Sequence, residues 1–424
     1  MKSYMESGIR MICRVMICRL ACWAMAGSLL ATAAGAQSKP SPVQTSPVQV
    51  LPVQSPPVQS PPIQALSVQP SAVAATVGGK PGSAFPSCSE NLASVPVPSA
   101  PHGLFTIIFP NKELEARAKR VLLHNPVVCG ANFYLVWSEI DRGPGASPRY
   151  DFSHVEQQMG PWIQAGKQVN LIGWAVAYGG KRVATPDYVL RDVQSVSCEH
   201  AGGPVPVFWE KGFMDNYQQF MKAAVEHFGS NRAVGYIRFG LGLGGETYPA
   251  CMYTLKEKGF TPQVWRKYIF DMLDYEASLN SPKTLMVGIN SFGQPPDLEF
   301  ADAVARRAVQ DKIAIGSQGL STEDLSADQA GSPCAVDWCK MFREAGGKVA
   351  LELQSVKQSN PDRQGRVGSM VDLLPFALKL HTQIFEIYAQ DWLLAYDPED
   401  PNYAQYHEEY QRAYEAAAKV VGAH

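Results

Sequence analysis

The chain has 424 residues, of which 46% are hydrophobic and 18% charged, so it can bury a sizeable core and wholesale disorder is excluded. The formal net charge is −2, and without a basic excess nucleic-acid binding is not expected. The length allows two or three domains, or one large barrel of alternating strands and helices.

Residues 1–36 have the composition of a signal peptide. Three arginines between positions 10 and 19 form a basic start, small apolar residues follow, and Ala34-Gly35-Ala36 fits the small-x-small cleavage rule. The alternative is a membrane anchor, but the apolar run is short for a span of about 20 residues. We therefore expect a secreted or periplasmic protein with no stable membrane span in the mature chain.

Residues 37–85 carry a five-residue repeat in which Val or Ile precedes Gln, from Val43 to Val68, with proline throughout. Proline fixes φ and lacks a backbone donor, so this tract favours an extended polyproline chain without a packed core. We expect a disordered Pro/Gln-rich linker that associates with the cell envelope as a spacer. A ligand for proline-recognising domains is the alternative.

The cysteines support export. Three of the nine precede the predicted cleavage site. The remaining six are Cys88, Cys129, Cys198, Cys251, Cys334 and Cys339. An even number in an exported chain suggests up to three disulfides, with fifteen possible connectivities, and buried free thiols are the alternative. No Cys/His grouping has zinc spacing, so no metal is expected.

From Gly103 onward, short apolar runs typical of buried strands alternate with stretches that carry apolar residues at helical spacing. The predicted strands are 104–109, 127–136, 168–176, 233–240, 284–290, 312–318, 348–354 and 382–388. The predicted helices are 113–123, 152–165, 213–228, 262–279, 298–309, 335–345, 370–380 and 403–421. Eight strand–helix units within residues 86–424 predict one α/β domain, a (β/α)8 TIM barrel with parallel strands.

An open doubly wound sheet is the alternative fold. It would place a Gly-rich phosphate loop after the first strand, where this chain has Phe109-Pro110-Asn111. The stretch from Gly240 to Gly245 matches G-x-G-x-x-G, but Thr247-Tyr248-Pro249 follows it where a dinucleotide site needs a helix start. We therefore expect no nucleotide, flavin or other cofactor.

Functional side chains of such a barrel lie at the C-terminal ends of the strands, and here these positions combine carboxylates with aromatic and amide groups. Cleavage of a glycosidic bond needs one carboxylic acid to protonate the leaving oxygen and one carboxylate to attack carbon or activate water. Aromatic rings stack on the apolar faces of sugars, while amides bond the hydroxyls. The pattern therefore predicts a carbohydrate substrate.

Glu246, after the fourth strand, and Glu352, on the seventh, are the predicted catalytic pair. Glu352 and Gln354 occupy the same side of an alternating strand, which should point them into the barrel. A lone carboxylate there costs desolvation unless it is used or paired. The alternatives are a salt bridge between Glu352 and Arg238, and a solvated loop position for Glu246.

The remaining strand-end residues are expected to bind substrate. Glu386 has the inward register of its strand and is the reserve candidate for a catalytic role, while Glu139 is expected to be a substrate-binding group or a buried partner of other charged groups. The other predicted sugar-site residues are Trp137, Trp174, Tyr178, Tyr248, Asn290, Gln318, Gln354, Tyr388 and Trp392.

The region 103–395 loosely resembles the β-galactosidase-like members of clan A, a clan of retaining barrel glycoside hydrolases. The motifs that carry the resemblance are Trp137-Ser138-Glu139-Ile140, Tyr150-Asp151-Phe152 and Gly166-Lys167-Gln168-Val169. The resemblance implies an acid/base Glu after strand four and a nucleophilic Glu on strand seven, which correspond to Glu246 and Glu352. Gly245 stands where the clan usually has an asparagine that contacts the sugar 2-hydroxyl.

A second, local resemblance is to the β-amylases. The stretch from Gly240 to Pro249 resembles their G-L-G-x-x-G-E-x-x-Y-P motif, with one residue fewer before Tyr-Pro, and Leu351-Glu352-Leu353 matches their strand-seven motif. It implies the same two glutamates in an inverting mechanism. A carboxyl separation of about 5–5.5 Å indicates retention and about 6.5–9.5 Å inversion; we expect retention, because the clan A resemblance is longer.

The sequence thus predicts an exported glycoside hydrolase that cleaves O-glycosidic bonds in an oligo- or polysaccharide with two carboxylates. The alternative is a non-catalytic glycan-binding or cell-envelope scaffold protein on a degenerate hydrolase barrel. Two long loops, 177–211 and 241–260, should lie over the barrel mouth. A disulfide between Cys198 and Cys251 would join them into a wall beside Glu246.

Overall fold

The computed structural model describes residues 101–422, apart from 110, 294–295, 330–337 and 366. The predicted signal peptide and linker lie outside these residues, as do the first residues of the predicted barrel domain and two cysteines, Cys88 and Cys334. Within the described ranges, no helix is both long and apolar enough to cross a membrane.

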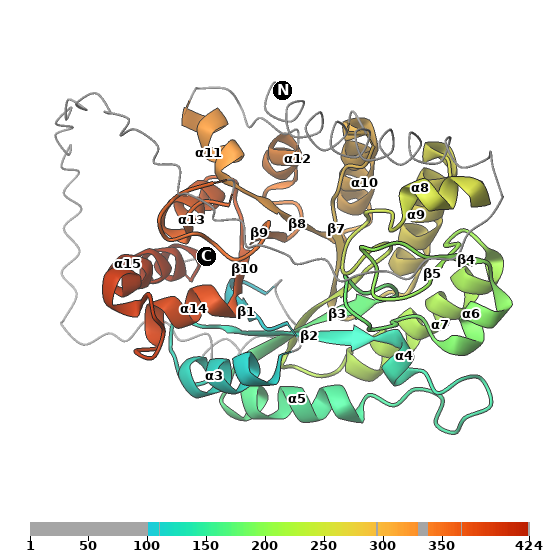
Figure 1. Cartoon of the computed structure of the whole chain (residues 1–424), viewed down its shortest axis with the longest axis horizontal. Coiled ribbons are helices and arrows are strands. Elements are labelled where there is room, and N and C mark those ends of the chain that lie inside the picture. Colours follow the sequence, from blue (N-terminus) through green and yellow to red (C-terminus); the bar gives the residue numbers. More distant parts are fainter. Residues whose placement is uncertain (1–100, 110, 294–295, 330–337, 366, 423–424) are drawn as a thin grey trace, which may run out of the picture. The chain divides into compact units, whose positions relative to one another are not determined.

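Eight parallel strands form a closed barrel in the order β1-β10-β9-β8-β7-β6-β3-β2, so each strand neighbours the next barrel strand along the chain (Figure 1). The barrel closes because β1 pairs with both β2 and β10. The strands are β1 (Gly103–Ile107), β2 (Gly130–Val136), β3 (Gln168–Trp174), β6 (Val234–Phe239), β7 (Thr284–Gly288), β8 (Ala314–Leu320), β9 (Leu351–Ser355) and β10 (Ile384–Tyr388). The predicted (β/α)8 barrel is confirmed.

The helices predicted from apolar periodicity form, and they flank the barrel strands (Figure 1). Side-chain caps start several of them: Asn111 accepts hydrogen bonds from the first turn of one helix, and Thr261 caps another, which has proline at its first position. The helices are α3 (Lys112–Leu122), α5 (Ser153–Gln164), α7 (Lys211–Phe228), α9 (Pro262–Ser278), α10 (Leu298–Gln310), α12 (Trp338–Ala345), α13 (Met370–Leu378) and α15 (Tyr403–Val421).

Shorter elements that the sequence analysis did not predict lie in the loops. Most have only one or two turns, too short for a periodic apolar pattern to be recognised. The helical ones are α4 (Trp137–Ile140), α6 (Asp187–Asp192), α8 (Met252–Leu255), η1 (Lys256–Lys258), α11 (Thr322–Gln329) and α14 (Ala389–Tyr396). Two short strands, β4 (Ser195–Val196) and β5 (Val205–Pro206), pair antiparallel in the loop between β3 and α7.

The barrel interior is apolar at one level and charged at the next. One buried cluster inside the strands consists of Phe105, Cys129, Tyr236, Met286, Ala314, Ala350 and Ile384. Because side chains alternate along a strand, the next inward positions on β6, β9 and β10 lie two residues further on, and they hold Arg238, Glu352 and Glu386. The predicted inward register of β9 and β10 is confirmed.

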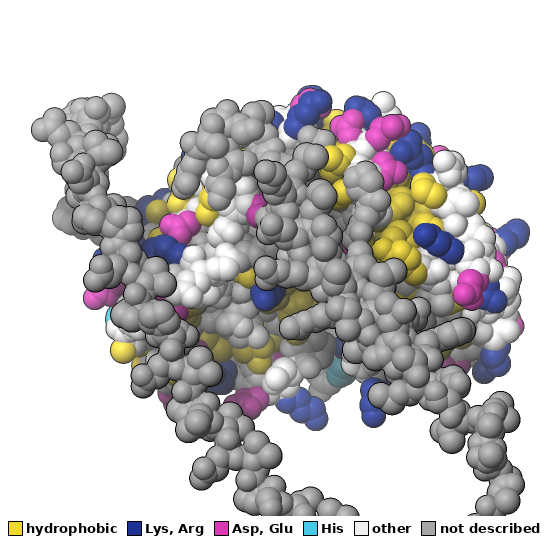
Figure 2. All heavy atoms as spheres, turned by 45° about the horizontal axis from the view of Figure 1, so that its top comes forward, with side chains coloured by type: hydrophobic (Ala, Val, Ile, Leu, Met, Phe, Trp, Pro, Cys, Tyr) yellow, Lys and Arg dark blue, Asp and Glu magenta, His cyan; other side chains and the backbone are white. Residues whose placement is uncertain are grey.

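The surface carries no single dominant charge in the view of Figure 2. Lys and Arg side chains are interspersed with Asp and Glu on the coloured part of this face. This distribution agrees with the small net charge of the whole chain, −2.

Candidate active site

Three charged side chains meet inside the barrel. Nη1 of Arg238 donates to Oε2 of Glu352 at 2.9 Å, and Nη2 donates to Oε2 of Glu386 at 3.1 Å. Neither carboxyl side chain is exposed, and the arginine is 3% exposed. The salt bridge that the sequence analysis left open as the alternative for Glu352 is therefore present.

Two glycines make room for this cluster. A Cβ at Gly316 would lie 2.3 Å from Oε2 of Glu352, and a Cβ at Gly245 would lie 2.8 Å from Cγ2 of Ile172 and 3.1 Å from Nε of Arg238. The space that a side chain at position 245 would need is therefore occupied.

Burial raises the pKa of both buried glutamates. It raises the pKa of Glu352 to about 7, against the opposing effects of the Arg238 charge and a hydrogen bond from Gln318; the Glu246 charge raises it further. Burial raises the pKa of Glu386 to about 8, and the Tyr236 hydroxyl donates to this carboxyl. Burial thus favours the protonated form of both carboxyl groups.

Glu246 lies in a compact loop directly after β6. The backbone N–H groups of Gly242 and Leu243 donate to the carbonyls of Glu246 and Tyr248 at 2.8 and 2.9 Å. A Cβ at Gly240 would lie 1.8 Å from the Gly244 carbonyl oxygen, and one at Gly242 would lie 2.1 Å from that of Tyr248. The glycines of the G-x-G pattern thus allow the backbone to pass close to itself.

Two predicted site residues hold the Glu246 carboxyl. Tyr178 donates its hydroxyl to Oε1 at 2.6 Å, and Asn290 donates Nδ2 to Oε2 at 3.0 Å. The backbone N–H of Thr247 donates to the other end of the Asn290 amide at 3.2 Å, which fixes its orientation. Burial raises the pKa of Glu246, while the Tyr178 hydrogen bond and the Arg238 charge oppose the rise.

Gln318 bonds Glu352 and lies close to the backbone at Glu246. Its Nε2 donates to Oε2 of Glu352 at 3.1 Å. Its Oε1 and the Cα of Glu246 both lie 3.2 Å from the point that a Cβ at Gly288 would occupy. The Oε1 atoms of Gln318 and Glu352 are buried and have no hydrogen-bond partner among the described residues. Gln318 is thus close to both the Glu352 carboxyl and the Glu246 backbone.

Aromatic rings form a continuous group beside this region. The ring centroids of Tyr134 and Trp174 lie 4.2 Å apart, and Phe109 stacks on Tyr134 at 5.9 Å and on Tyr388 at 5.7 Å. Tyr388 also accepts a 2.8 Å hydrogen bond from Gln354. The sequence analysis missed Phe109 and Tyr134. The alternation of β2 could have indicated Tyr134, which is two residues from the buried, polar Asn132.

Two predicted sugar-site residues do not line the barrel mouth. Trp137 is completely buried and packs against Tyr217 of α7, with its ring centroid at 5.1 Å. Trp392 is completely buried and packs against Tyr414 of α15 at 4.4 Å. Both follow strands, but they belong to α4 and α14, which direct the rings into the helical layer. These two residues are therefore left out of the proposed sugar site.

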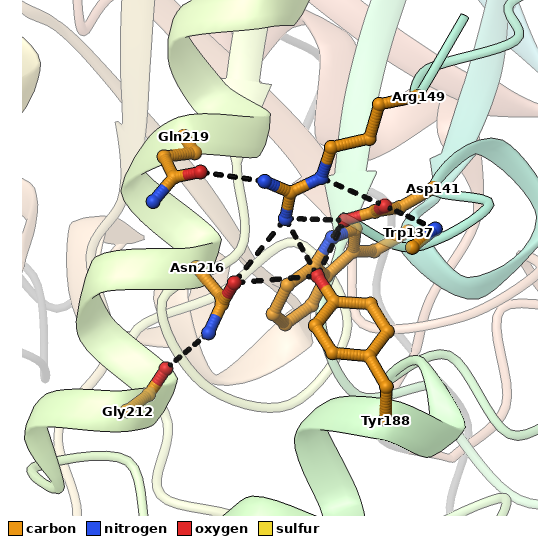
Figure 3. Close-up of polar contacts among 8 residues, drawn as sticks. Trp137, Asp141, Arg149, Tyr188, Gly212, Asn216 and Gln219 are labelled. Carbon is orange, nitrogen blue, oxygen red and sulfur yellow. Dashed lines mark hydrogen bonds and ion pairs between the residues drawn. The ribbon is translucent and has the colours of Figure 1, made fainter. Parts of the chain in front are cut away.

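Figure 3 shows the polar network that fixes Trp137 and the loop after it. Asp141 accepts hydrogen bonds from the Trp137 indole at 3.1 Å, from the Tyr188 hydroxyl at 2.7 Å and from two Arg149 nitrogens at 3.1 Å. Arg149 also donates to Gln219 of α7 at 2.6 Å. Burial alone would raise the pKa of Asp141, but the Arg149 and Tyr188 hydrogen bonds hold it below its usual value.

Glu139 lies at the surface beside the site. It accepts two hydrogen bonds from Arg182, at 2.8 and 2.7 Å, and its side chain is 43% exposed. Tyr248, another predicted sugar-site residue, is 37% exposed. Both remain accessible, in contrast to Glu352 and Glu386.

The predicted disulfide between Cys198 and Cys251 is confirmed. It joins the loop after β3 to the loop after β6, which carries Glu246. The loop after β3 is also held by an antiparallel bridge between Tyr178 and Ala201. Cys129 and Cys339 are disulfide-bonded as well.

A surface hollow of about 680 Å³ lies elsewhere, along α9 and the start of α10. Its lining is mostly charged, and Arg266 forms ion pairs there with Asp297 at 3.7 Å and Glu299 at 3.3 Å. These helices cover the outside of the barrel, so the hollow is separate from the glutamate pair. Among the described residues, no group of three His, Cys, Asp or Glu side chains could hold a metal ion.

No family model matches the chain, and no curated protein matches it. Solved structures similar to it include a β-galactosidase from Bacillus circulans sp. alkalophilus (11% identity, TM-score 0.49, covering 76% of this chain and 57% of that one). Others are a family 10 endo-β-1,4-xylanase from Gloeophyllum trabeum (10%, 0.46, covering 79% and 100%) and a β-amylase catalytic domain from Paenibacillus polymyxa (9%, 0.42, covering 68% and 93%). The chain thus spans less than two thirds of that β-galactosidase, and its (β/α)8 fold follows from the closed barrel itself.

Proposed function

We propose that this protein is a glycoside hydrolase that cleaves O-glycosidic bonds in an oligo- or polysaccharide, with Glu246 as general acid and Glu352 as the second carboxylate. The observation that carries the proposal is the unequal use of the two Glu352 oxygens. Oε2 accepts from both Arg238 and Gln318, whereas Oε1 has no partner within the described part of the chain. One stabilised and one uncommitted oxygen suit a group that attacks carbon or takes a proton from water.

The surroundings of Glu246 suit the opposite role. Its raised pKa favours the protonated form, which can deliver a proton to the leaving oxygen. After the transfer, the hydrogen bonds from Tyr178 and Asn290 stabilise the carboxylate that remains. In a retaining reaction, the same carboxylate then activates water for the second step.

The aromatic group and the amides would bind the sugar. Trp174, Tyr388, Phe109 and Tyr134 supply ring faces, and Asn290, Gln318 and Gln354 supply amides for hydroxyl groups. We propose retention of configuration on the basis of the longer sequence resemblance. Proton NMR during early hydrolysis identifies the anomer that is formed first, which distinguishes retention from inversion.

The proposal can be tested by incubating the full-length mature protein with a panel of polysaccharides and measuring the appearance of new reducing ends. Glu246→Gln and Glu352→Gln should each lower turnover by about three orders of magnitude or more, because each removes one of the two carboxyl functions. Glu299→Gln, at an exposed position on α10, is the matched control and should keep wild-type activity. Wild-type turnover in either site variant would remove that residue from the mechanism.

A non-catalytic glycan-binding barrel is the second candidate, and one observation favours it. Glu352 is completely buried and paired with Arg238, as a purely structural ion pair would be. In that case the protein would bind polysaccharides without releasing reducing ends. Glu352→Gln would then alter stability but not glycan binding.

We also propose that the mature chain is secreted or periplasmic and that the linker associates with the cell envelope. The composition of residues 1–36 and the Cys198–Cys251 disulfide support an oxidising compartment. N-terminal sequencing of the exported protein should begin at Gln37. Retention of the first 36 residues in the cytoplasmic fraction would contradict this proposal.

A further inference from the structure

Among the residues that the structure describes, the exposed aromatic side chains gather on the loops beside Glu246. In the described ranges, only four large hydrophobic side chains are exposed: Tyr248 (37%), Val420 (45%), Tyr178 (46%) and Tyr253 (68%). Scattered exposed apolar residues are normal, but a group of them indicates a binding surface. All three tyrosines lie on the loops after β3 and β6.

These tyrosines follow one another outward from the carboxyl group. Tyr178, on the loop after β3, donates to Glu246. Tyr248 lies two residues after Glu246 on the loop after β6, and Tyr253 lies in the first turn of α8. A Cβ at Gly244 would lie 2.4 Å from Cε2 of Tyr178, so the Tyr178 ring lies against the loop that carries Tyr248 and Tyr253. Burial is the main cause of the raised pKa of Tyr178 and of Tyr248.

The segment that carries the outer rings is held in place. Cys251, immediately before α8, is bonded to Cys198 in the loop after β3. The Tyr248 carbonyl accepts from the Leu243 N–H at 2.9 Å. The ammonium of Lys256 lies 5.2 Å from the centroid of the Tyr253 ring. A ring that is already positioned loses little conformational entropy when a ligand binds.

We propose that Tyr248 and Tyr253 form an outer binding site for further sugar units of a glycan chain that extends beyond Glu246. This inference rests on the proposed function, since it takes the chain to be a carbohydrate. Flat phenol rings present an apolar face for the C–H face of a sugar and a hydroxyl for its polar groups. The exposed side chains that follow Tyr253 are charged, namely Lys256, Glu257 and Lys258, which suits a hydrated glycan and not a lipid surface.

Affinity electrophoresis of the full mature protein in gels containing soluble starch, β-1,4-galactan, β-1,4-xylan or β-1,3-glucan tests this site. At least one polysaccharide should retard the wild type, and Tyr253→Ala should weaken that binding about fivefold, the loss expected for one stacking ring. Tyr253→Phe keeps the ring and should keep most of the affinity. Val420→Ala, at the exposed position on α15, is the matched control and should bind like the wild type.

Activity gives a second measurement on the polysaccharide that binds. Tyr253→Ala should lower the ratio of kcat/KM on its hexasaccharide to kcat/KM on its disaccharide by about fivefold. Unchanged binding and an unchanged ratio in Tyr253→Ala, or no retardation of the wild type by any of the four polysaccharides, would overturn the outer site. Retardation that depends on Tyr253 but without hydrolysis would keep the outer site and reject the hydrolase.

Discussion

Nη1 of Arg238 donates a 2.9 Å hydrogen bond to Oε2 of Glu352 across the interior of the barrel, between strands that are not neighbours in the sheet. The other terminal nitrogen reaches Glu386. One guanidinium thus faces two buried carboxyl groups, and its charge favours the ionised form of Glu352 that the proposed mechanism requires.

Replacing this guanidinium should change the pH dependence of activity. In Arg238→Met, loss of the positive charge raises the pKa of Glu352, so the acidic limb of kcat/KM should move to higher pH. The variant should also lose about 3 kcal/mol of stability, because a buried ion pair loses one partner. Arg238→Lys keeps the charge and should shift the limb less. An unmoved acidic limb in a folded Arg238→Met variant would exclude Glu352 as the group that titrates there.

Tyr178→Phe tests the proposed acid. The Tyr178 hydroxyl bonds the Glu246 carboxylate and lowers its pKa, so its removal should raise that pKa and move the basic limb of kcat/KM to higher pH. The maximum of kcat/KM should fall about tenfold, as expected when one charge-assisted hydrogen bond is lost. Tyr248→Phe is the control for the loss of a hydroxyl group: within the described part of the chain the Tyr248 hydroxyl does not bond Glu246, so this variant should leave the basic limb in place. A basic limb that stays where it is in Tyr178→Phe would assign it to another group.

The barrel could be predicted from the eight strand–helix units of the sequence. The inward register of Glu352 and Glu386 could be predicted because side chains alternate along each strand. Trp137 and Trp392 do not lie at the barrel mouth, for an equally local reason. Each follows a strand, but a helix of one or two turns begins at once and carries the ring into the helical layer. Helices this short leave no apolar period from which that direction could be inferred.

The contacts between distant segments do not follow from local sequence patterns. Whether Arg238 pairs with Glu352 depends on the width of the barrel and on Gly316, which leaves space for the carboxylate. Likewise, Phe109 joins the aromatic group only because the barrel closes and brings it against Tyr134 and Tyr388. Such contacts depend on the closed tertiary structure, which no single segment specifies.

The Cys198–Cys251 disulfide should stabilise the wall beside Glu246. The double variant Cys198→Ser/Cys251→Ser avoids reducing the other disulfides, and it should lose about 2–4 kcal/mol by denaturant unfolding. Limited proteolysis should cut it in 177–211 or 241–260 at protease concentrations that spare the wild type. Identical cleavage patterns and unfolding midpoints for the two proteins would contradict a stabilising role.

Stability should fall as the pH rises from about 5 to 8. Burial raises the pKa of Glu386 from 4.5 to about 8 and that of Asp391 from 3.8 to about 7. Across this window the unfolded chain releases these protons before the folded protein does, so ionisation favours unfolding. Tm should therefore be higher at pH 5 than at pH 8.

The variant Glu386→Gln measures how much the Glu386 carboxyl contributes to this fall in Tm. The amide imitates the protonated carboxyl, so the fall in Tm between pH 5 and pH 8 should be smaller than in the wild type. Glu299→Gln, whose carboxyl is exposed on α10, should leave the pH dependence unchanged. An equal fall in the Glu386→Gln and Glu299→Gln variants would show that Glu386 does not carry the effect.

Glu276 of α9 should be a site where substitution stabilises the protein. Its side chain is fully buried, neither carboxyl oxygen has a hydrogen-bond partner in the described residues, and burial raises its pKa well above the usual value. Glu276→Met keeps a similar volume and removes this desolvation cost, so stability at pH 7 should rise by about 1–3 kcal/mol.

The gain in stability from Glu276→Met should be larger at pH 7 than at pH 4. At pH 4 the carboxyl is mostly protonated in both the folded and the unfolded wild-type protein, so the substitution should help less than at pH 7. Glu299→Met on α10, where the side chain is 81% exposed, should give no gain at either pH. Denaturant unfolding at both values measures the difference. A Glu276→Met protein that is less stable than the wild type at pH 7 would mean that the carboxyl group forms a favourable interaction in the folded protein.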